Sequence, residues 1–249
     1  MTTQRRLIFD TIANARDLGG CSVGGNGQHT RWRTFVRADH FQSWSEATRQ
    51  ALIDYGVKLV IDLRAPHELQ RMPNSFATSQ EITYLNIPLL TDELDLSPHF
   101  QALRMKMADN HEMYAFMLNE SKPQIGKIFT AMATHNVPTL FHCYAGKDRT
   151  GIITALLLSL ANADHEVIAH DYSLTGEYLV EHIAEQRTAA LAAGMDIERF
   201  DVWFASTTQT MVTTLSHIQE SHGGARAYLS ACGVSDEHID TLRAMLVED

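Results

Sequence analysis

Short apolar runs alternate along the chain with segments in which apolar residues recur every three or four positions. Three of the short runs are typical of strands. The first of them, VKLVIDL, is rich in β-branched residues and suits a strand that is buried on both faces of a sheet. The expected strands cover residues 57–63, 82–89 and 137–142.

Segments with helical periodicity lie between and after these strands. Residues 47–55 follow Ser43 and Glu46, which have the spacing of a capping box, and Gly56 ends the segment. In residues 121–135 the apolar positions recur at i, i+3, i+4 and i+7, as on one face of a helix. A further helix is expected to begin at about residue 150. The remaining expected helices cover residues 169–193, 200–219 and 235–247.

The order of these elements indicates an α/β fold with a central, mostly parallel sheet flanked by helices and with extra C-terminal helices. The chain shows no repeat and no linker rich in Pro, Gly or Ser, so we expect a single domain over residues 1–249. Ligands bind such sheets at the carboxyl ends of the strands. Asp62 and Cys143 both stand at strand ends, so we expect both at one crevice.

Charge and composition narrow the classes of partner and the location. A formal net charge of −10 argues against a nucleic-acid-binding protein, because phosphate backbones are bound through clustered Lys and Arg. The N-terminal residues lack the apolar core of a signal peptide, and the longest apolar run falls far short of the ~20 residues that span a bilayer. The three cysteines form no disulfide framework. We therefore expect a cytoplasmic protein with no integral membrane segment, while export by a route with no readable signal stays open.

The sequence FHCYAGKDRTG, residues 141–151, places charged residues between the third strand and the next helix. Cys143 would be a poor nucleophile as a thiol, whose reference pKa is ~8.5. The positive end of the following helix, the amides of a tight loop, and the charges of Lys147 and Arg149 all favour the anion. Such surroundings bring the pKa of reactive cysteines to ~3.5–7.5, so we expect Cys143 to be largely a thiolate at neutral pH.

The same features suit the loop to hold a phosphate dianion. Its amides and the helix dipole would receive the phosphate oxygens, and the planar fork of Arg149 would hold two of them at once. A phosphoryl group held there lies in line with the sulfur for transfer. Thr150 would donate its hydroxyl to the sulfur when water cleaves the phosphocysteine. The expected substrate-binding residues are Tyr144, Ala145, Gly146, Lys147, Asp148 and Thr150.

Other interpretations of this loop are weaker. A Walker A loop requires Gly where Phe141 stands and Ser or Thr where Asp148 stands. An inert buried cysteine accounts for neither the C-x5-R spacing nor the two cations. A sulfurtransferase also places a cysteine in an anion-binding loop, and a catalytically silent module would bind phosphate with the same amides, so both of these stay open.

HCYAGKDRTG resembles the H-C-x-x-G-K-D-R-T-G signature of the cysteine-dependent tyrosine phosphatase superfamily, in particular its microbial branch. NARDLGG (14–20) and VIDLRAPHE (60–68) are similar to the N-x-R-D-x-G-G and D-L-R segments of that branch, and the C-terminal ARAYLSACGVSDEHIDTLR resembles the family's end. The resemblance spans nearly the whole chain. It implies hydrolysis of phosphate monoesters through a phosphocysteine, with no metal or organic cofactor.

A general acid should protonate the departing oxygen, and two aspartates compete for this role. Asp62 matches the D-L-R position that the resemblance suggests for the acid, and its alternative is a structural carboxylate paired with Arg64. Asp148 lies inside the loop, where another negative charge beside the phosphate is unhelpful. We assign Asp148 to orienting the loop or contacting substrate, with the acid role as second choice. The expected catalytic residues are therefore Cys143, Arg149 and Asp62.

Further polar residues receive supporting roles. We expect His142 to fix the loop through a ring hydrogen bond. Lys147 suits a multiply phosphorylated headgroup, or it balances the charge of Asp148. Arg16 and Asp17 are expected to serve in a structural ion pair.

The resemblance also implies a helical lid over the pocket, for which we take residues 178–204. Tyr178, Ile183, Leu191 and Phe204 would shield the thiolate, and an ordinary packed helical hairpin explains them equally well. The leading function is a protein-tyrosine phosphatase with broad phosphoresidue specificity, acting on phosphorylated proteins. A phosphoinositide phosphatase is the alternative.

Overall fold

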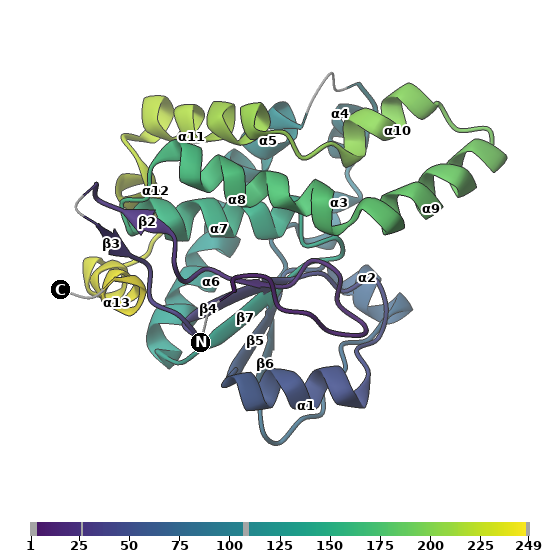
Figure 1. Ribbon diagram of the computed structural model, residues 1–249. Helices are drawn as coiled ribbons and strands as arrows, with labels where there is room; N and C mark the ends of the chain where they lie inside the picture. The colour runs from purple at the N-terminus through teal and green to yellow at the C-terminus, as the bar shows by residue number, and fades with distance from the viewer. Residues whose placement is uncertain (1–3, 26, 107–109, 248–249) are drawn as a thin grey trace.

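A five-stranded sheet forms the centre of the molecule in the computed structural model, which describes residues 4–25, 27–106 and 110–247 (Figure 1). The strands of this sheet are β1 (Arg16–Asp17), β4 (Phe35–Ala38), β5 (Leu59–Asp62), β6 (Thr83–Asn86) and β7 (Thr139–His142), and β2 (Ser22–Val23) pairs separately with β3 (Gln28–His29). The order across the sheet is β1-β4-β7-β5-β6. All neighbours are parallel except β1 and β4, which confirms the mostly parallel sheet expected from the sequence.

The register of the parallel strands brings their carboxyl ends to one edge of the sheet. Asp62, the last residue of β5, lies opposite His142 on β7 and Asn86 on β6. Ala38, the last residue of β4, also lies opposite His142. The segments that follow these strands therefore converge, as they do at the ligand sites of such sheets.

Helices cover both faces of the sheet. They are α1 (Glu46–Tyr55), α2 (Pro66–Arg71), α3 (Asp92–Asp95), α4 (Pro98–Lys106), α5 (His111–Glu120), α6 (Lys122–His135), α7 (Asp148–Leu160), α8 (His165–Tyr178), α9 (Val180–Ala192), α10 (Ile197–Phe204), α11 (Thr208–His222), α12 (Ala225–Ala231) and α13 (Asp236–Leu246). None of these helices, in the ranges that the structure describes, combines the length and the apolar character needed to cross a bilayer.

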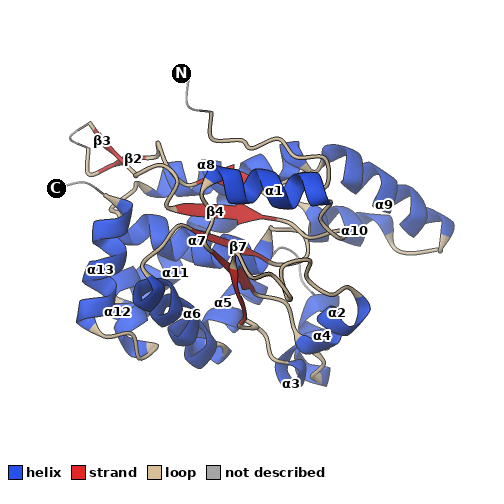
Figure 2. Ribbon diagram, turned by 90° about the horizontal axis from the view of Figure 1, so that it is seen from below, coloured by secondary structure: helices blue, strands red, loops and turns tan. Residues whose placement is uncertain are grey.

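Successive residues of β7 show how the core is divided between the two faces. Leu140 packs with Leu52 of α1, and Phe141 on the opposite face packs with side chains of α6 and α7. Figure 2, seen from below, shows α1 in front of the sheet. The larger cluster joins the sheet to the C-terminal helices, which confirms the extra helices expected there.

Two long helices expected from the sequence are each interrupted. The stretch 169–193 is divided at Leu179, which leaves helical geometry between α8 and α9 and buries its side chain. The stretch 200–219 is divided between α10 and α11, because Thr207 caps a new helix by accepting from the Thr210 amide. The cap of α1 also differs, since Ser45 accepts from the Thr48 amide in place of Ser43.

The strand β4 is not predicted by the sequence pattern. Its four residues are all buried, and one of them is the charged Arg37. A fully buried arginine interrupts the apolar run on which a strand prediction depends. Arg37 is tolerated because Asp171 of α8 pairs with it at 2.7 Å in the interior.

Candidate active site

Cys143 directly follows β7, at the edge of the sheet where the parallel strands end. Residues 143–149, which we call the cysteine loop, lead from this strand into α7, which begins at Asp148. Cys143 is only 2% exposed and forms part of the lining of a cavity of about 810 Å³. The other loop residues that line this cavity are Tyr144, Ala145, Lys147, Asp148 and Arg149.

Three successive carbonyl groups of the cysteine loop are held from the side away from the cavity. The hydrogen bonds run from His40 N to Tyr144 O (2.8 Å), from Asn14 Nδ2 to Ala145 O (3.0 Å) and from Arg37 Nη2 to Gly146 O (2.7 Å). The amide of a trans peptide points opposite to its carbonyl group. The amides of Ala145, Gly146 and Lys147 are therefore directed toward the cavity, which is the arrangement of an anion-binding nest.

The N-terminal motif supports the loop from behind through Asn14 and Arg16. Arg16 donates to Asn14 Oδ1 at 2.5 Å and forms an ion pair with the buried Asp171 at 3.1 Å. Asp17 has a different role, because it accepts from backbone amides, including that of Gly19 at 2.6 Å. The expected ion pair is thus found for Arg16, whereas Asp17 stabilises the turn that follows β1.

Arg149 stands in the first turn of α7 and is held by Glu68 of α2. The two side chains form a bidentate pair, with 2.5 Å from Nη1 to Oε2 and 3.0 Å from Nη2 to Oε1. Burial lowers the pKa of Arg149, but the Cys143 sulfur and the Glu68 carboxylate outweigh it and raise this pKa above its ordinary value. Arg149 is therefore a fixed cation beside the sulfur. The sequence does not single out Glu68, although it lies within the VIDLRAPHE segment.

Asp62 does not line the cavity. Its carboxylate is fully buried and accepts from Arg64, with 2.9 Å from Nε to Oδ1 and 2.7 Å from Nη2 to Oδ2. Asn74 and Tyr84 also donate to Oδ2, each at 3.2 Å. Burial raises the pKa of Asp62, but electrostatic interactions with His142 and with the Arg64 guanidinium outweigh it and hold this pKa well below its usual range. This geometry fits the structural carboxylate paired with Arg64 and does not fit the acid role expected for Asp62.

His142 supports the cysteine loop from the strand side. Its Nδ1 lies 2.9 Å from the carbonyl oxygen of Cys143, and its Nε2 lies 2.8 Å from Nδ2 of Asn74. These partners assign the ring proton to Nδ1, which donates, and leave Nε2 as the acceptor. Burial lowers the pKa of His142, which favours the neutral form of the ring. The ring hydrogen bond expected from the sequence is present.

Asp148 and Lys147 form an ion pair in the cysteine loop, but their surroundings differ. The Asp148 side chain is 21% exposed and lines the cavity, and Tyr114 donates to its Oδ1 at 2.6 Å. Lys147 Nζ lies 3.2 Å from the same oxygen and also donates to the carbonyl oxygens of Trp203, in the last turn of α10, and of Ala205, which follows this helix. Lys147 therefore ties α10 to the cysteine loop and balances Asp148, and its amine does not stand free for a phosphorylated headgroup.

Thr150 is buried next to the loop, and its hydroxyl makes no hydrogen bond within the described ranges. The expected bond to the Cys143 sulfur is thus not formed in this structure. An unpaired buried hydroxyl costs free energy, which favours a partner in another state of the site. The role of Thr150 stays a prediction.

The hairpin formed by α9 and α10 covers the cavity with apolar side chains, and Figure 1 shows it at the right of the molecule. Ile183 and Phe204 line the cavity as expected. Leu191 is 53% exposed, and Tyr178 stacks below the guanidinium of Arg6 at 4.1 Å from the ring centroid. Tyr178 and Leu191, two of the four side chains expected to shield the sulfur, therefore do not line the cavity.

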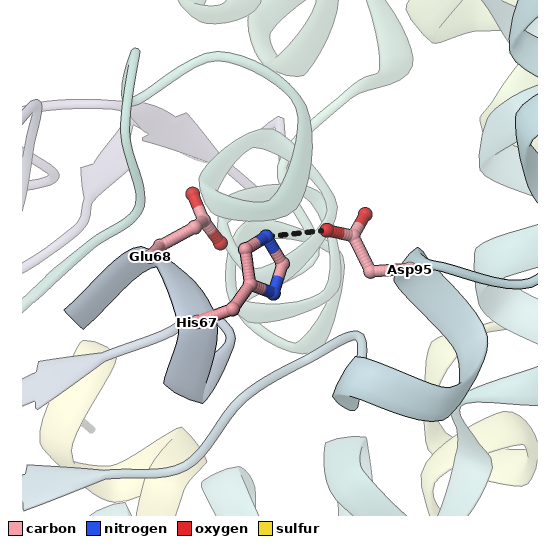
Figure 3. Close-up of side chains that lie close together, drawn as sticks. All are labelled: His67, Glu68 and Asp95. Carbon is pink, nitrogen blue, oxygen red and sulfur yellow. Dashed lines mark ion pairs between the residues drawn. The ribbon is translucent and has the colours of Figure 1, made fainter. Parts of the chain in front are cut away.

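His67, Glu68 and Asp95 lie at the rim of the cavity, with possible ligand atoms within 4.8 Å of one another (Figure 3). His67 Nε2 lies 3.4 Å from Asp95, and its Nδ1 lies 2.7 Å from Asp92. Both oxygens of Glu68 already accept from Arg149. A cation bound here would be repelled by the positive charge of the Arg149 guanidinium, so we assign no metal to this cluster.

Comparison with known proteins agrees with the loop chemistry. The chain matches the tyrosine phosphatase family over residues 7–248. A tyrosine-protein phosphatase of Nostoc commune is 33% identical over 222 residues, which cover 85% of this chain and 74% of the relative. The triple specificity protein phosphatase PtpB of Mycobacterium tuberculosis is 24% identical over 253 residues, which cover 85% of this chain and 90% of that protein.

A solved structure of P. aeruginosa TpbA in complex with pTyr covers 92% of this chain and 95% of its own, with 15% identity. Its TM-score of 0.31 is too low to carry an argument. The family match, in contrast, favours a hydrolase over the sulfurtransferase and the silent phosphate-binding module. With Cys143 directly after β7 and Arg149 in the first turn of α7, and with this match over nearly all its length, the chain belongs to the tyrosine phosphatase family and is a phosphoric monoester hydrolase.

Proposed function

We propose that the protein dephosphorylates phosphotyrosine in proteins, and other phosphoresidues as well, through a phosphocysteine on Cys143. The observation that carries this proposal is the set of loop amides directed at the cavity around a buried sulfur. The name of the relative PtpB, a triple specificity phosphatase, supports a broad range of phosphoresidues.

In the first step the Cys143 sulfur attacks phosphorus, and the bond from phosphorus to the leaving oxygen breaks. The loop amides and Arg149 hold the other phosphate oxygens and stabilise the charge that develops on them. Glu68 fixes the guanidinium plane of Arg149 while leaving the remaining N–H groups for phosphate. Binding and transition-state stabilisation thus come from the same groups.

We assign the proton donor to Asp148 in place of Asp62. Asp148 lines the cavity beside Arg149, whereas both oxygens of Asp62 accept from Arg64 in the interior. Asp148 gives its proton to the leaving oxygen as the P–O bond breaks. It then takes a proton from the water that attacks phosphorus, and the P–S bond breaks to release Cys143 and inorganic phosphate. We assign Thr150 to donate its hydroxyl to the departing sulfur.

Phosphoinositides are the second candidate substrate class, and the dimensions of the cavity favour them. Its volume of about 810 Å³ exceeds what a single aryl phosphate fills, and Arg71 and Arg104 add cations to that of Arg149. A headgroup with several phosphates requires such additional cations. Since Lys147 is bound to α10, Arg71 and Arg104 are the residues that we assign to further phosphates.

We also infer that the α9–α10 hairpin acts as a lid within a single domain over residues 1–249. Its side chains make up much of the cavity lining opposite the cysteine loop. The bonds from Lys147 to the end of α10 hold this lid down in the present structure. We keep the cytoplasmic location as a prediction.

A substrate panel with wild type and one active-site variant tests the proposal. Phosphotyrosine, phosphoserine, phosphothreonine and phosphoinositide substrates are compared for wild type and Cys143→Ser, each with and without EDTA. We expect turnover that is lost in Cys143→Ser and indifferent to EDTA, with phosphotyrosine turned over fastest. Turnover that survives in Cys143→Ser, or that EDTA abolishes, contradicts the mechanism.

The identity of the general acid is tested by comparing substrates whose leaving groups differ in their need for a proton. Asp148→Asn should lower kcat/KM, which reports the step that forms the phosphocysteine, roughly 10²–10⁴-fold for an alkyl phosphate and much less for a nitrophenyl phosphate, whose leaving group needs no proton. The same comparison with Asp62→Asn should show no such difference. A leaving-group difference in Asp62→Asn and none in Asp148→Asn would return the acid role to Asp62.

A further inference from the structure

Tyr114 of α5 makes direct contact with the Asp148 carboxyl group from the interior of the protein. The ring is fully buried, and its hydroxyl lies 2.6 Å from Asp148 Oδ1. The same hydroxyl lies 2.6 Å from that of Tyr172 on α8, and the two rings meet edge to face. Tyr114 therefore sits between the core and a carboxyl group that faces the cavity.

The hydroxyl of Tyr114 serves as a proton donor to Asp148 throughout the working pH range. Burial and then the charge of Asp148 raise the pKa of Tyr114 well above its ordinary value. Burial likewise raises the pKa of Tyr172 far above neutrality. Since each phenol has one proton, Tyr114 donates to Oδ1 and accepts from Tyr172.

The two oxygens of Asp148 consequently have different surroundings. Oδ1 accepts from Tyr114 at 2.6 Å and forms an ion pair with Lys147 Nζ at 3.2 Å. A proton on Oδ1 would compete with the Tyr114 hydroxyl proton and weaken the ion pair with Lys147. The transferable proton therefore belongs on Oδ2, the other oxygen of a side chain that remains partly exposed to the cavity.

We propose that Tyr114 is a positioning residue that fixes the rotation of the Asp148 carboxyl group, so that the proton given to the leaving group resides on Oδ2. This inference rests on the proposed role of Asp148 as the acid. When the P–O bond breaks, the Oδ2 proton passes to the leaving oxygen and its bonding electrons remain on the carboxylate. The new charge is shared with Oδ1, where the bond from Tyr114 becomes charge-assisted and stronger.

A comparison of leaving groups with Tyr114→Phe tests this assignment. This variant removes one hydroxyl and keeps the buried ring. We expect kcat/KM for an alkyl phosphate to fall roughly tenfold or more, as part of the roughly 10²–10⁴-fold effect of general acid catalysis, and to stay within about twofold for a nitrophenyl phosphate.

Tyr228→Phe is the matched control. Tyr228 is also fully buried, and its hydroxyl donates to the carbonyl oxygen of Leu118 at 2.7 Å, outside the cavity lining. This control loses a comparable buried hydrogen bond and should lower kcat/KM equally, if at all, for both substrates. Equal losses on both substrates in Tyr114→Phe would show a merely structural role and overturn the inference.

The double variant Tyr114→Phe with Asp148→Asn separates this inference from the proposed function. If Asp148→Asn lowers kcat/KM equally for the alkyl and the nitrophenyl phosphate, and so lacks the leaving-group difference, Asp148 is not the acid. If Asp148→Asn shows the difference and Tyr114→Phe does not, only the positioning role is wrong. If both are right, Tyr114→Phe adds no further leaving-group difference to Asp148→Asn.

A ring-fluorinated tyrosine at position 114 keeps the hydroxyl, and it replaces Tyr114→Phe if that variant does not fold. The more acidic phenol is a stronger donor to Oδ1 and stabilises the carboxylate. We expect the alkaline limb of the kcat/KM profile for an alkyl phosphate to move to lower pH. A profile unchanged from that of wild type would overturn the inference.

Discussion

Gly146 offers the sharpest test of the cysteine loop, because the structure leaves no room for a side chain there. The residue has a left-handed backbone with a φ of +64°. A Cβ atom at this position would lie 2.5 Å from the carbonyl oxygen of Ala38 and 2.8 Å from its carbonyl carbon. Ala38 is the last residue of β4 and is paired in the sheet with His142, which holds it in place. The cysteine loop is therefore the part that must move in Gly146→Ala.

Gly25 provides a matched control with the same backbone conformation. Its φ is also +64°, and a Cβ atom there would have nothing within 4 Å. Each alanine variant should therefore lose about 1–2 kcal/mol of stability from left-handed strain. Only Gly146→Ala must in addition shift the loop, by close to 1 Å if the approach of 2.5 Å is to reach ordinary contact at 3.4 Å, and a displacement of about 1 Å costs roughly 10²-fold in rate.

The assay compares kcat/KM on an aryl phosphate, the inhibition constant of vanadate and the free energy of unfolding in urea. We expect kcat/KM of Gly146→Ala to fall about 100-fold and vanadate to bind more weakly. Gly25→Ala should keep kcat/KM within about threefold of wild type while losing about 1–2 kcal/mol of stability. A Gly146→Ala enzyme as active as Gly25→Ala would refute the claim that the loop amides form the phosphate site.

Three further predictions follow from the contacts around the loop. Asp62→Asn leaves the charge of Arg64 poorly compensated in the interior, so its free energy of unfolding should fall by about 3 kcal/mol, and its thermal midpoint by roughly 6–12 °C in a calorimetric scan. Glu68→Gln should weaken vanadate binding about tenfold by releasing Arg149, and an unchanged inhibition constant would speak against the bidentate clamp. Burial lowers the pKa of His40 to about 3, so folded His40 stays neutral while the unfolded chain takes up a proton near pH 6.5. The free energy of unfolding of wild type should therefore decrease relative to that of His40→Gln as the pH falls from about 6.5 toward 3. Urea unfolding that gives both proteins the same pH dependence of this free energy would contradict the prediction.

The parallel sheet and the loop could be predicted because their signals are local. β5, β6 and β7 each lie inside the expected apolar runs, and α1 and α6 begin and end within about two residues of the expected bounds. The cysteine and arginine stand on one strand–loop–helix unit, so that their spacing alone brings them together. Local chemistry was sufficient for this part of the site.

The residues that support the loop could not be predicted because they come from distant parts of the chain. Glu68 is 81 residues from Arg149, and Arg37 is 109 residues from Gly146. Tyr114 lies in a segment with no motif at all. Sequence periodicity shows which residues are buried, but the partner of a buried polar group depends on tertiary packing.

Asp62 shows the limit of an argument from position along a strand. Its place at the carboxyl end of β5 was predicted correctly. The direction of its side chain depends on Arg64, two residues further, which folds back to form two charge-assisted hydrogen bonds with it. The D-L-R sequence contained this pair, and the alternative of a structural carboxylate was the one consistent with the geometry.

The covalent intermediate on Cys143 is the central claim, and rapid acid quenching of Asp148→Asn tests it most directly. With a nitrophenyl phosphate the first step needs no proton donor, but the hydrolysis step lacks its base, so the phosphoenzyme should accumulate. Mass spectrometry of the digested protein should then find one phosphoryl group on the peptide that contains Cys143. A phosphoryl group on another residue, or nitrophenol release with no phosphorylated peptide at any quench time, would contradict the account.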